Sequence, residues 1–142
     1  MTTISFSDFN LSPEIVVGCE ERQRLTVLAM SAVGHAPEDS DFLLYELDRA
    51  KTVPDDALPP DIVRVGSFVR FRNIEGEERT MRVVLPEEAD PARSRISVLS
   101  PLGTALLGLR PGQSITWLDG DGQKQFLTAL AVLPPHEARA SE

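Results

Sequence analysis

Three carboxylates within four residues are the strongest candidates for chemistry in this sequence. Glu38, Asp39 and Asp41 lie in the stretch "PEDSDF", next to the turn-forming "GHAP". Carboxylate oxygens are the ligands that Mg²⁺ prefers, so such a group could help to position a magnesium ion that is held elsewhere. Acidic residues are also common in the first turn of a helix, where they complement the helix dipole. Both interpretations stay open.

The other residues that could do chemistry lack suitable neighbours. The stretch "DGDG" from Asp119 begins like a calcium-binding loop, but Gln123 and Leu130 stand where further ligands are needed. An Asp-Gly turn between two strands is the simpler interpretation. His35 and His136 have no second ligand at a metal-binding spacing. The sequence therefore predicts no metal site, no cofactor and no catalytic residue.

A basic and aromatic pattern at "SFVRFRN" has two interpretations. Arginines on both sides of Phe71 could contact a nucleic acid. Strand alternation explains the pattern more simply, with Val69 and Phe71 in the core and Arg70 and Arg72 in solvent. The net charge is −8, and residues 1–61 carry 12 acidic against 4 basic residues, whereas residues 62–142 carry 10 of each. Because an acidic surface repels phosphates, we predict no direct sequence-specific binding of nucleic acid.

The first part of the chain has the periodicity of two helices. After a short strand at 14–17, apolar residues recur at helical spacing and predict a helix over 19–33. The residues of this stripe are Leu25, Leu28, Ala29, Ala32 and Val33. Residues 38–53 repeat the pattern with Phe42 or Leu43, Leu47 and Ala50. With "GHAP" between them, the two segments predict a short antiparallel helical hairpin, or coiled coil, of about 21–23 Å.

The period changes from 3.6 to 2 after a proline-rich stretch. Residues 54–61, "PDDALPPD", predict a linker. The following residues predict about five strands with one short helix at "PLGTALLG", in which Phe71, Trp117 and Phe126 are expected in the core. The fold class is therefore α+β, divided into an N-terminal segment with the hairpin (1–53), the linker, a β-rich domain (62–134) and a flexible tail (135–142).

The composition restricts where the protein acts. No apolar run reaches the roughly 18–20 residues that span a bilayer, and the first residues lack the pattern of a secretory signal. Cys19 is the only cysteine, so it cannot form an internal disulfide. We expect a cytoplasmic protein without a membrane partner, and a monomer.

Two stretches resemble one family. Residues 87–115 contain "EADP", "ISVLSPLGTALLG" and "PGQSI", and they are similar to the C-terminal domain of the bacterial Gre transcript-cleavage factors. Residues 45–73 contain "ELDRA", the proline linker and "FRN", which resemble the regulator of nucleoside diphosphate kinase (Rnk) family of that superfamily. The resemblance implies an FKBP-like C-terminal fold and RNA polymerase as the partner, bound at the rim of its secondary channel. The polymerase-binding residues that it implies are Asp90, Ser100, Pro101 and Leu102.

The region around Pro101 is expected to present a surface. Proline ends the strand over 95–100 and is expected to leave the strand edge exposed, with Leu106 and Leu107 as apolar anchors underneath. Nothing in this stretch supplies a nucleophile or a base. The sequence therefore predicts a surface that binds a partner.

Three functions follow from the resemblance. Gre factors have a longer hairpin whose acidic tip brings Mg²⁺ to the polymerase, and about 22 Å of helix falls short of that. We therefore expect a transcription regulator that occupies the secondary-channel region without catalysing a reaction. The first alternative is transcript-cleavage stimulation through Glu38, Asp39 and Asp41. The second is an FKBP-type peptidyl-prolyl isomerase, which is disfavoured because it needs an aromatic-lined pocket and only 6% of the residues are aromatic.

Overall fold

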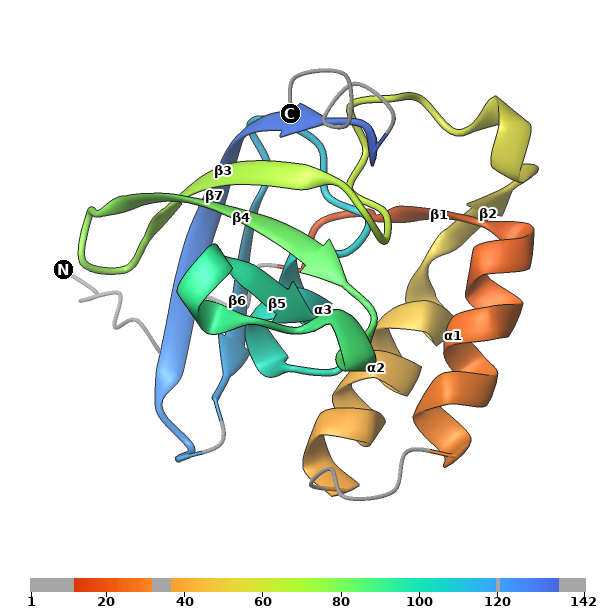
Figure 1. Cartoon of the computed structure of the whole chain (residues 1–142), viewed down its shortest axis with the longest axis horizontal. Coiled ribbons are helices and arrows are strands. Elements are labelled where there is room, and N and C mark those ends of the chain that lie inside the picture. Colours follow the sequence, from red (N-terminus) through yellow and green to blue (C-terminus); the bar gives the residue numbers. More distant parts are fainter. Residues whose placement is uncertain (1–11, 32–36, 120, 136–142) are drawn as a thin grey trace, which may run out of the picture.

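A curled five-stranded sheet, a two-stranded sheet and a pair of helices are the main elements of the described structure (Figure 1). The computed structural model describes residues 12–31, 37–119 and 121–135. The strands of the sheet, in the order β5-β4-β3-β7-β6, are β3 (Phe68–Asn73), β4 (Glu78–Val84), β5 (Arg95–Ser97), β6 (Ser114–Leu118) and β7 (Lys124–Leu133). The short helix α3 (Pro101–Leu106) connects β5 to β6. The predicted α+β class, with about five strands and one short helix, is confirmed.

Alternation along β3 determines which of its side chains are exposed to solvent. Val69 and Phe71 are buried, whereas Arg70 and Arg72 are exposed and lie 3.8 and 3.2 Å from the carboxylate of Glu78 on β4. All pairings in the sheet are antiparallel except β4 with β5, which is parallel. The simpler interpretation of "SFVRFRN" is thus confirmed, since its arginines have cross-strand carboxylate partners.

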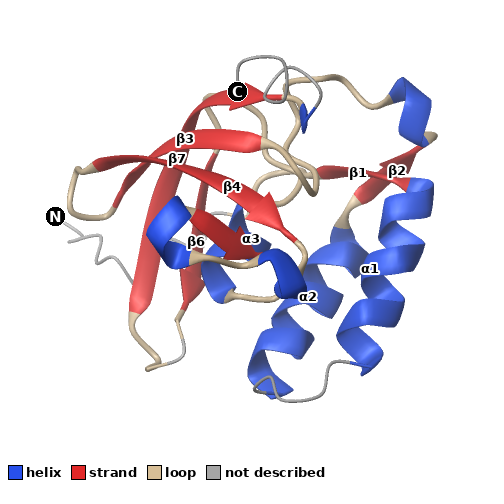
Figure 2. Ribbon diagram, in the orientation of Figure 1, coloured by secondary structure: helices blue, strands red, loops and turns tan. Residues whose placement is uncertain are grey.

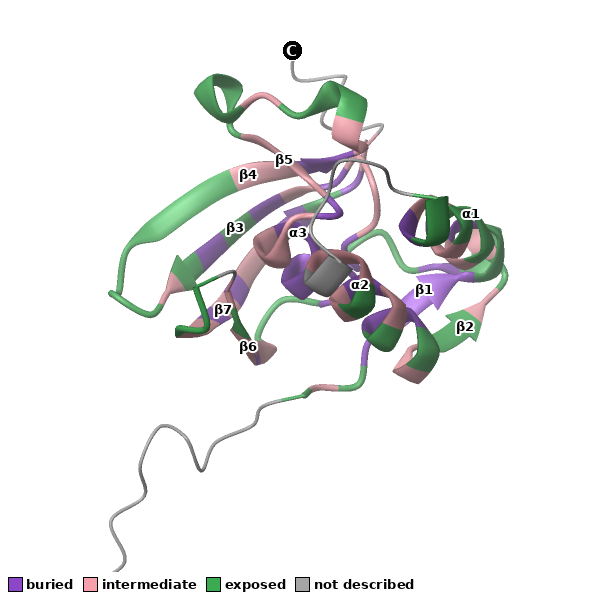
Figure 3. Cartoon of the chain, turned by 90° about the horizontal axis from the view of Figure 1, so that it is seen from below, coloured by how far each residue is buried: buried purple, intermediate pink, exposed green. Residues whose placement is uncertain are grey.

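The helices lie beside the sheet rather than above it. Figure 2 shows α1 (Cys19–Ser31) and α2 (Pro37–Arg49) side by side at one end of the molecule. Figure 3 shows α3 between α2 and the strands, and buried residues collect along these contacts. One buried cluster contains Leu25 and Ala29 of α1, Leu43 and Leu47 of α2, and sheet residues such as Phe71. The apolar faces predicted for both helices therefore contribute to a core that includes the sheet.

The second helix is shorter than the sequence suggests. The helix predicted over 38–53 ends at Arg49, and β2 (Lys51–Val53) follows it. This strand pairs in parallel with β1 (Val16–Gly18), with Val16 opposite Lys51 and Gly18 opposite Val53. Pro54 disfavours helical geometry at Val53, and the pairing with β1 supplies hydrogen bonds that the helix would otherwise have made. The prediction of helix over residues 50–53 is therefore wrong.

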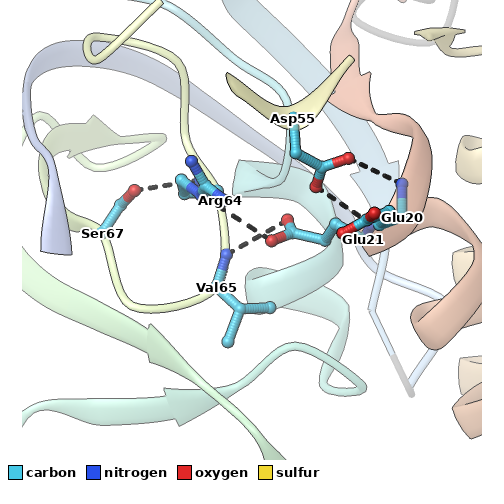
Figure 4. Close-up of polar contacts among 6 residues, drawn as sticks. All are labelled: Glu20, Glu21, Asp55, Arg64, Val65 and Ser67. Carbon is cyan, nitrogen blue, oxygen red and sulfur yellow. Dashed lines mark hydrogen bonds and ion pairs between the residues drawn. The ribbon is translucent and has the colours of Figure 1, made fainter. Parts of the chain in front are cut away.

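The stretch predicted as a linker contacts α1. Asp55 begins the 3₁₀ turn η2 (Asp55–Ala57), and its carboxylate accepts hydrogen bonds from the backbone N–H of Glu20 at 2.7 Å and of Glu21 at 3.2 Å (Figure 4). These donors are the unpaired N–H groups at a helix start. A side chain at Gly18 would overlap the same carboxylate. The independence of the two parts joined by residues 54–61 stays a prediction.

Removing this cap tests its contribution to stability. We expect Asp55→Ala to lower the free energy of unfolding by about 1 kcal/mol, because the N–H groups at the start of α1 lose their acceptor. Asp55→Asn retains an acceptor oxygen and serves as the matched control, with a smaller expected loss. Urea unfolding of the three proteins measures the difference. An alanine variant as stable as the wild type would show that the cap does not contribute to the free energy of unfolding.

Within the parts of the chain that the structure describes, no helix combines the length and the apolar character that crossing a bilayer requires.

Candidate functional site

The start of α3 borders a hollow on the inner face of the sheet. The hollow has a volume of about 520 Å³ and is called the sheet hollow below. The described residues that line it are Phe71, Asn73, Arg79, Ile96, Ser100, Pro101, Leu102, Trp117, Asp119, Asp121, Gln125 and Phe126. Three of the four predicted polymerase-binding residues thus meet here, at one edge of a partly aromatic depression.

Local hydrogen bonds hold the start of α3 in place. The hydroxyl of Ser100 accepts from the backbone N–H of Gly103 at 3.1 Å and donates to the carbonyl of Ser97 at 2.7 Å. Pro101 occupies the first helical position, where its missing N–H costs nothing. Thr104 is fully buried and donates to the carbonyl of Val98 at 2.7 Å. Pro101 and Leu102 are therefore displayed on a short, firmly anchored turn.

The anchors of this turn are the ones that the sequence predicts. Leu106 and Leu107 are both 0% exposed and belong to the main buried cluster. Burial of leucine side chains at this level stabilises a fold by about 1.5–3 kcal/mol each. The prediction that they hold the turn against the body is confirmed.

Asp90 lies elsewhere, at the outer edge of β5. It is not among the residues that line the sheet hollow. Its backbone pairs with Arg95, donating at 2.9 Å and accepting at 3.1 Å, while the carbonyl of Ser97 accepts from the N–H of Ser100 at 3.0 Å. The chain's own residues thus cover much of the β5 edge. The expectation that this strand edge is open is wrong, because the loop before β5 and the turn after it fold back onto it.

Two of the three aromatic residues expected in the core are only partly buried. Phe71 is 2% exposed, as predicted, whereas Trp117 and Phe126 are half-buried. Trp117 is two residues from the buried Ile115 and shares its face of the sheet, where it lines the sheet hollow. Phe126, which is opposite Thr116 in the pairing of β6 with β7, also lines this hollow. Sequence reasoning therefore missed Trp117 as a site residue, although its spacing from Ile115 could have indicated its face.

The predicted acidic tip lies at the start of α2. The side chain of Glu38 is outside the described residues, as are Ala32, Val33, His35 and His136. Asp39 is half-buried and Asp41 is exposed, and both line a second hollow that faces β6. Their carboxylates therefore border the body of the molecule next to the sheet hollow.

The turn at Asp119 is structural. Its carboxylate accepts hydrogen bonds from the N–H groups of Asp121 and Gln123, each at 2.9 Å, and from the side-chain amide of Gln125 at 2.9 Å. The bond from Gln125, followed by the bond from Gln123, lowers the pKa of Asp119 below its ordinary value. The interpretation of "DGDG" as a turn between two strands is confirmed, since it joins β6 to β7.

A buried carboxylate joins α1 to the loop before β3. Glu21 is 5% exposed, accepts from the N–H of Val65 at 3.3 Å and lies 3.9 Å from the guanidinium of Arg64 (Figure 4). Burial raises the pKa of Glu21 above its ordinary value of 4.5, and it outweighs the lowering by Val65, Arg64 and Arg24. No local pattern signals this contact, because an acidic residue in a first helical turn is ordinary.

The raised pKa predicts a pH dependence of stability. Glu21 contributes stability that is present below pH 4.5 and is lost as the pH rises through its folded-state pKa. Glu21→Gln keeps the acceptor for Val65 without a titrating group. We expect the melting temperature of the wild type to fall relative to that of Glu21→Gln as the pH rises above 4.5 and through the raised pKa of Glu21. The exposed Glu20→Gln is the control, and a constant difference for Glu21→Gln would contradict the assignment.

The sequence of this chain is similar to those of known transcription factors and regulators. A family model described as "Transcription elongation factor, GreA/GreB, C-term" matches residues 58–133. The regulator of nucleoside diphosphate kinase of Escherichia coli K12 is 36% identical over 121 residues, which cover 84% of this chain and 89% of that protein. GreA of Clostridium kluyveri is 37% identical over 81 residues, covering 56% of this chain and 51% of its own.

A solved structure covers nearly the whole described chain. The transcription elongation factor GreA/GreB from Nitrosomonas europaea superimposes with a TM-score of 0.65 at 33% sequence identity, covering 86% of this chain and 99% of that one. The likeness therefore extends beyond the sheet and includes residues of the helical part.

Proposed function

Because this chain belongs to the family of GreA/GreB-type transcription elongation factors that includes the regulator of nucleoside diphosphate kinase, we propose that it binds RNA polymerase. It acts as a regulator at the rim of the secondary channel, in the cytoplasm, and catalyses no reaction of its own. Its FKBP-like sheet region makes the main contact, and its short helical hairpin lies toward the channel. The residues proposed to contact the polymerase are Asp90, Ser100, Pro101 and Leu102.

The observation that carries this proposal is the display of Pro101 and Leu102 beside the sheet hollow. Both side chains are half-buried, on a turn whose anchors Leu106 and Leu107 are fully buried. A rigid apolar lip next to a depression is what a protein partner can use as an anchor point, because little conformational entropy is lost on binding. Asp90, at the β5 edge, supplies a charged contact outside the hollow.

The shortness of the hairpin supports a regulator without chemistry. α1 and α2 have 13 residues each, which corresponds to about 20 Å of helix. Asp39 and Asp41 line the second hollow, which faces β6, and are therefore near the body of the molecule.

A transcript-cleavage assay with RNA polymerase separates this proposal from cleavage stimulation. We expect no stimulation of transcript cleavage in stalled complexes, and stimulation that is lost when Glu38, Asp39 and Asp41 become alanine would support the alternative.

A binding assay with core RNA polymerase tests the proposal itself. We expect the wild-type chain to be retained by immobilised core polymerase, and Pro101→Ala and Ser100→Asp to weaken retention. Aspartate at position 100 can still accept from the N–H of Gly103, but it loses the hydrogen bond to the carbonyl of Ser97 while it adds a charge to the lip, so the melting temperature of this variant is measured beside its binding. Failure of the wild type to bind would overturn the proposal.

The aromatic residues in the sheet hollow are relevant to the isomerase alternative. Phe71 and Trp117 both line the sheet hollow, so aromatic residues gather more closely than the composition suggests. An assay of proline-limited refolding measures this activity directly. We expect no acceleration, and a clear acceleration that Trp117→Ala removes would replace the regulator by an enzyme.

A further inference from the structure

A second depression separates α2 from the β6–β7 turn. It has a volume of about 800 Å³ and is called the hairpin groove here. The lining residues used below are Asp39, Asp41, Tyr45, Pro101, Trp117 and Leu118. Among the described residues that line it, four are acidic and none is lysine or arginine. The groove therefore has one sign of charge.

Large apolar side chains are exposed in this groove. Tyr45 is 63% exposed and Leu118 is 61% exposed, and they belong to opposite walls, α2 and β6. Trp117 is half-buried between the two hollows. Single exposed apolar residues are common, but an aromatic and an aliphatic side chain facing one depression mark an interaction surface.

The carboxylates of the groove differ in their surroundings. The carboxylate of Glu46 is buried and accepts from the guanidinium of Arg49 at 2.9 Å, and Asp119 holds its own turn. Asp41, by contrast, is exposed at the end of the groove nearest the start of α2, so its carboxylate is the charge that an occupant would meet there.

The hairpin groove is continuous with the sheet hollow. Pro101 and Trp117 line both depressions, so a chain bound at the lip of α3 could extend from one into the other without leaving the surface. This continuity connects the groove to the surface proposed above as the polymerase contact, and the identity of the occupant rests on that proposal.

We propose that the hairpin groove holds a basic segment of the polymerase, with a lysine or arginine side chain facing Asp41. Apolar side chains of the same segment pack on Tyr45 and Leu118, and a guanidinium can stack on Trp117. Opposite charges at the rim of such a contact raise the association rate and set the orientation of the partner. The groove thus specifies the chemistry of the partner segment and gives the short hairpin a binding role.

Charge reversal at the groove tests this assignment. Asp41→Lys is compared with Glu75→Lys, which reverses a likewise exposed acidic residue in the turn between β3 and β4. Tyr45→Ala is compared with Met30→Ala, which truncates a 75% exposed side chain of α1. We expect Asp41→Lys and Tyr45→Ala each to weaken binding to core RNA polymerase about tenfold, and both controls to stay within about twofold. The salt dependence of binding should decrease for Asp41→Lys only.

The outcomes separate this inference from the proposed function. If Ser100→Asp weakens binding while Asp41→Lys and Tyr45→Ala behave like their controls, the groove assignment is wrong and the proposed function stands. If the wild type self-associates in sedimentation and Tyr45→Ala does not, the groove binds a second copy of this chain and the assignment is wrong.

If the wild type does not bind core RNA polymerase, the proposed function is wrong. A synthetic peptide of alternating lysine and leucine then tests the groove, against a glutamate–leucine control. Binding that Asp41→Lys removes supports a groove for basic segments, and equal binding of both peptides refutes it.

Discussion

Gly103→Ala is expected to destabilise the protein by about 3 kcal/mol, because the new methyl group has no space. A Cβ at this position would overlap the carbonyl oxygen of Ser97 and lie 2.9 Å from its carbonyl carbon. Both groups are backbone, so neither can rotate away. Relief requires α3 to move off β5, which would also disturb the buried Thr104 and its hydrogen bond to Val98.

A second glycine separates this clash from a general effect of substitution. Gly76 has a φ of +83°, and a Cβ added there would meet nothing within 4 Å. Gly76→Ala therefore costs only the backbone strain, about 1 kcal/mol. Chemical unfolding of both variants measures the difference. Equal losses for the two variants would show that α3 approaches β5 less closely than the distances at Gly103 indicate.

Leu102→Glu is expected to weaken binding to RNA polymerase by about a hundredfold while the fold is kept. Leu102 is half-buried at the lip of the sheet hollow, so a carboxylate there would be desolvated by any partner that covers it. Glutamate near the start of α3 does not oppose the helix, since negative charge is favourable at a helix N-terminus. Because Leu102 also packs against the buried cluster, the melting temperature should fall too, so the affinities are compared at a temperature at which both proteins are fully folded.

The matched control for this variant is Leu133→Glu. Leu133 is 48% exposed and pairs with Phe68, whereas the sheet hollow involves Asn73 and Gln125 at the other end of the same strand pair. Titration of labelled protein with core polymerase gives both affinities. Comparable losses for the two variants would mean that added negative charge weakens binding wherever it is placed, and the hollow would lose its assigned role.

Much of the sheet could be predicted from local pattern. The alternation at 68–73, the Asp-Gly turn at Asp119 and the turn "PLGTALLG" each depend on neighbours in sequence, and each lies where it is expected. The strand β2 escapes prediction because its partner β1 lies 35 residues away, from Val16 to Lys51, and no local pattern reports a pairing at that distance.

The other contacts that the sequence does not predict also join residues far apart in the chain. Local composition places Asp55 in a solvated linker, but its carboxylate caps a helix that begins 36 residues earlier. Helix-dipole reasoning explains Glu21 without a partner, but the loop at Val65 buries it. The strand that contains Trp117 is predicted correctly, whereas the extent to which α3 covers that strand depends on tertiary packing.

A competition experiment on core RNA polymerase tests the central claim most directly. A labelled GreA-type factor is bound to the polymerase, and the wild-type chain or Leu102→Glu is added at increasing concentration. We expect the wild type to displace the labelled factor completely, Leu102→Glu to do so only at about a hundredfold higher concentration, and transcript cleavage to fall as the factor leaves. Simultaneous binding of both proteins, or no displacement at any concentration, would contradict the claim.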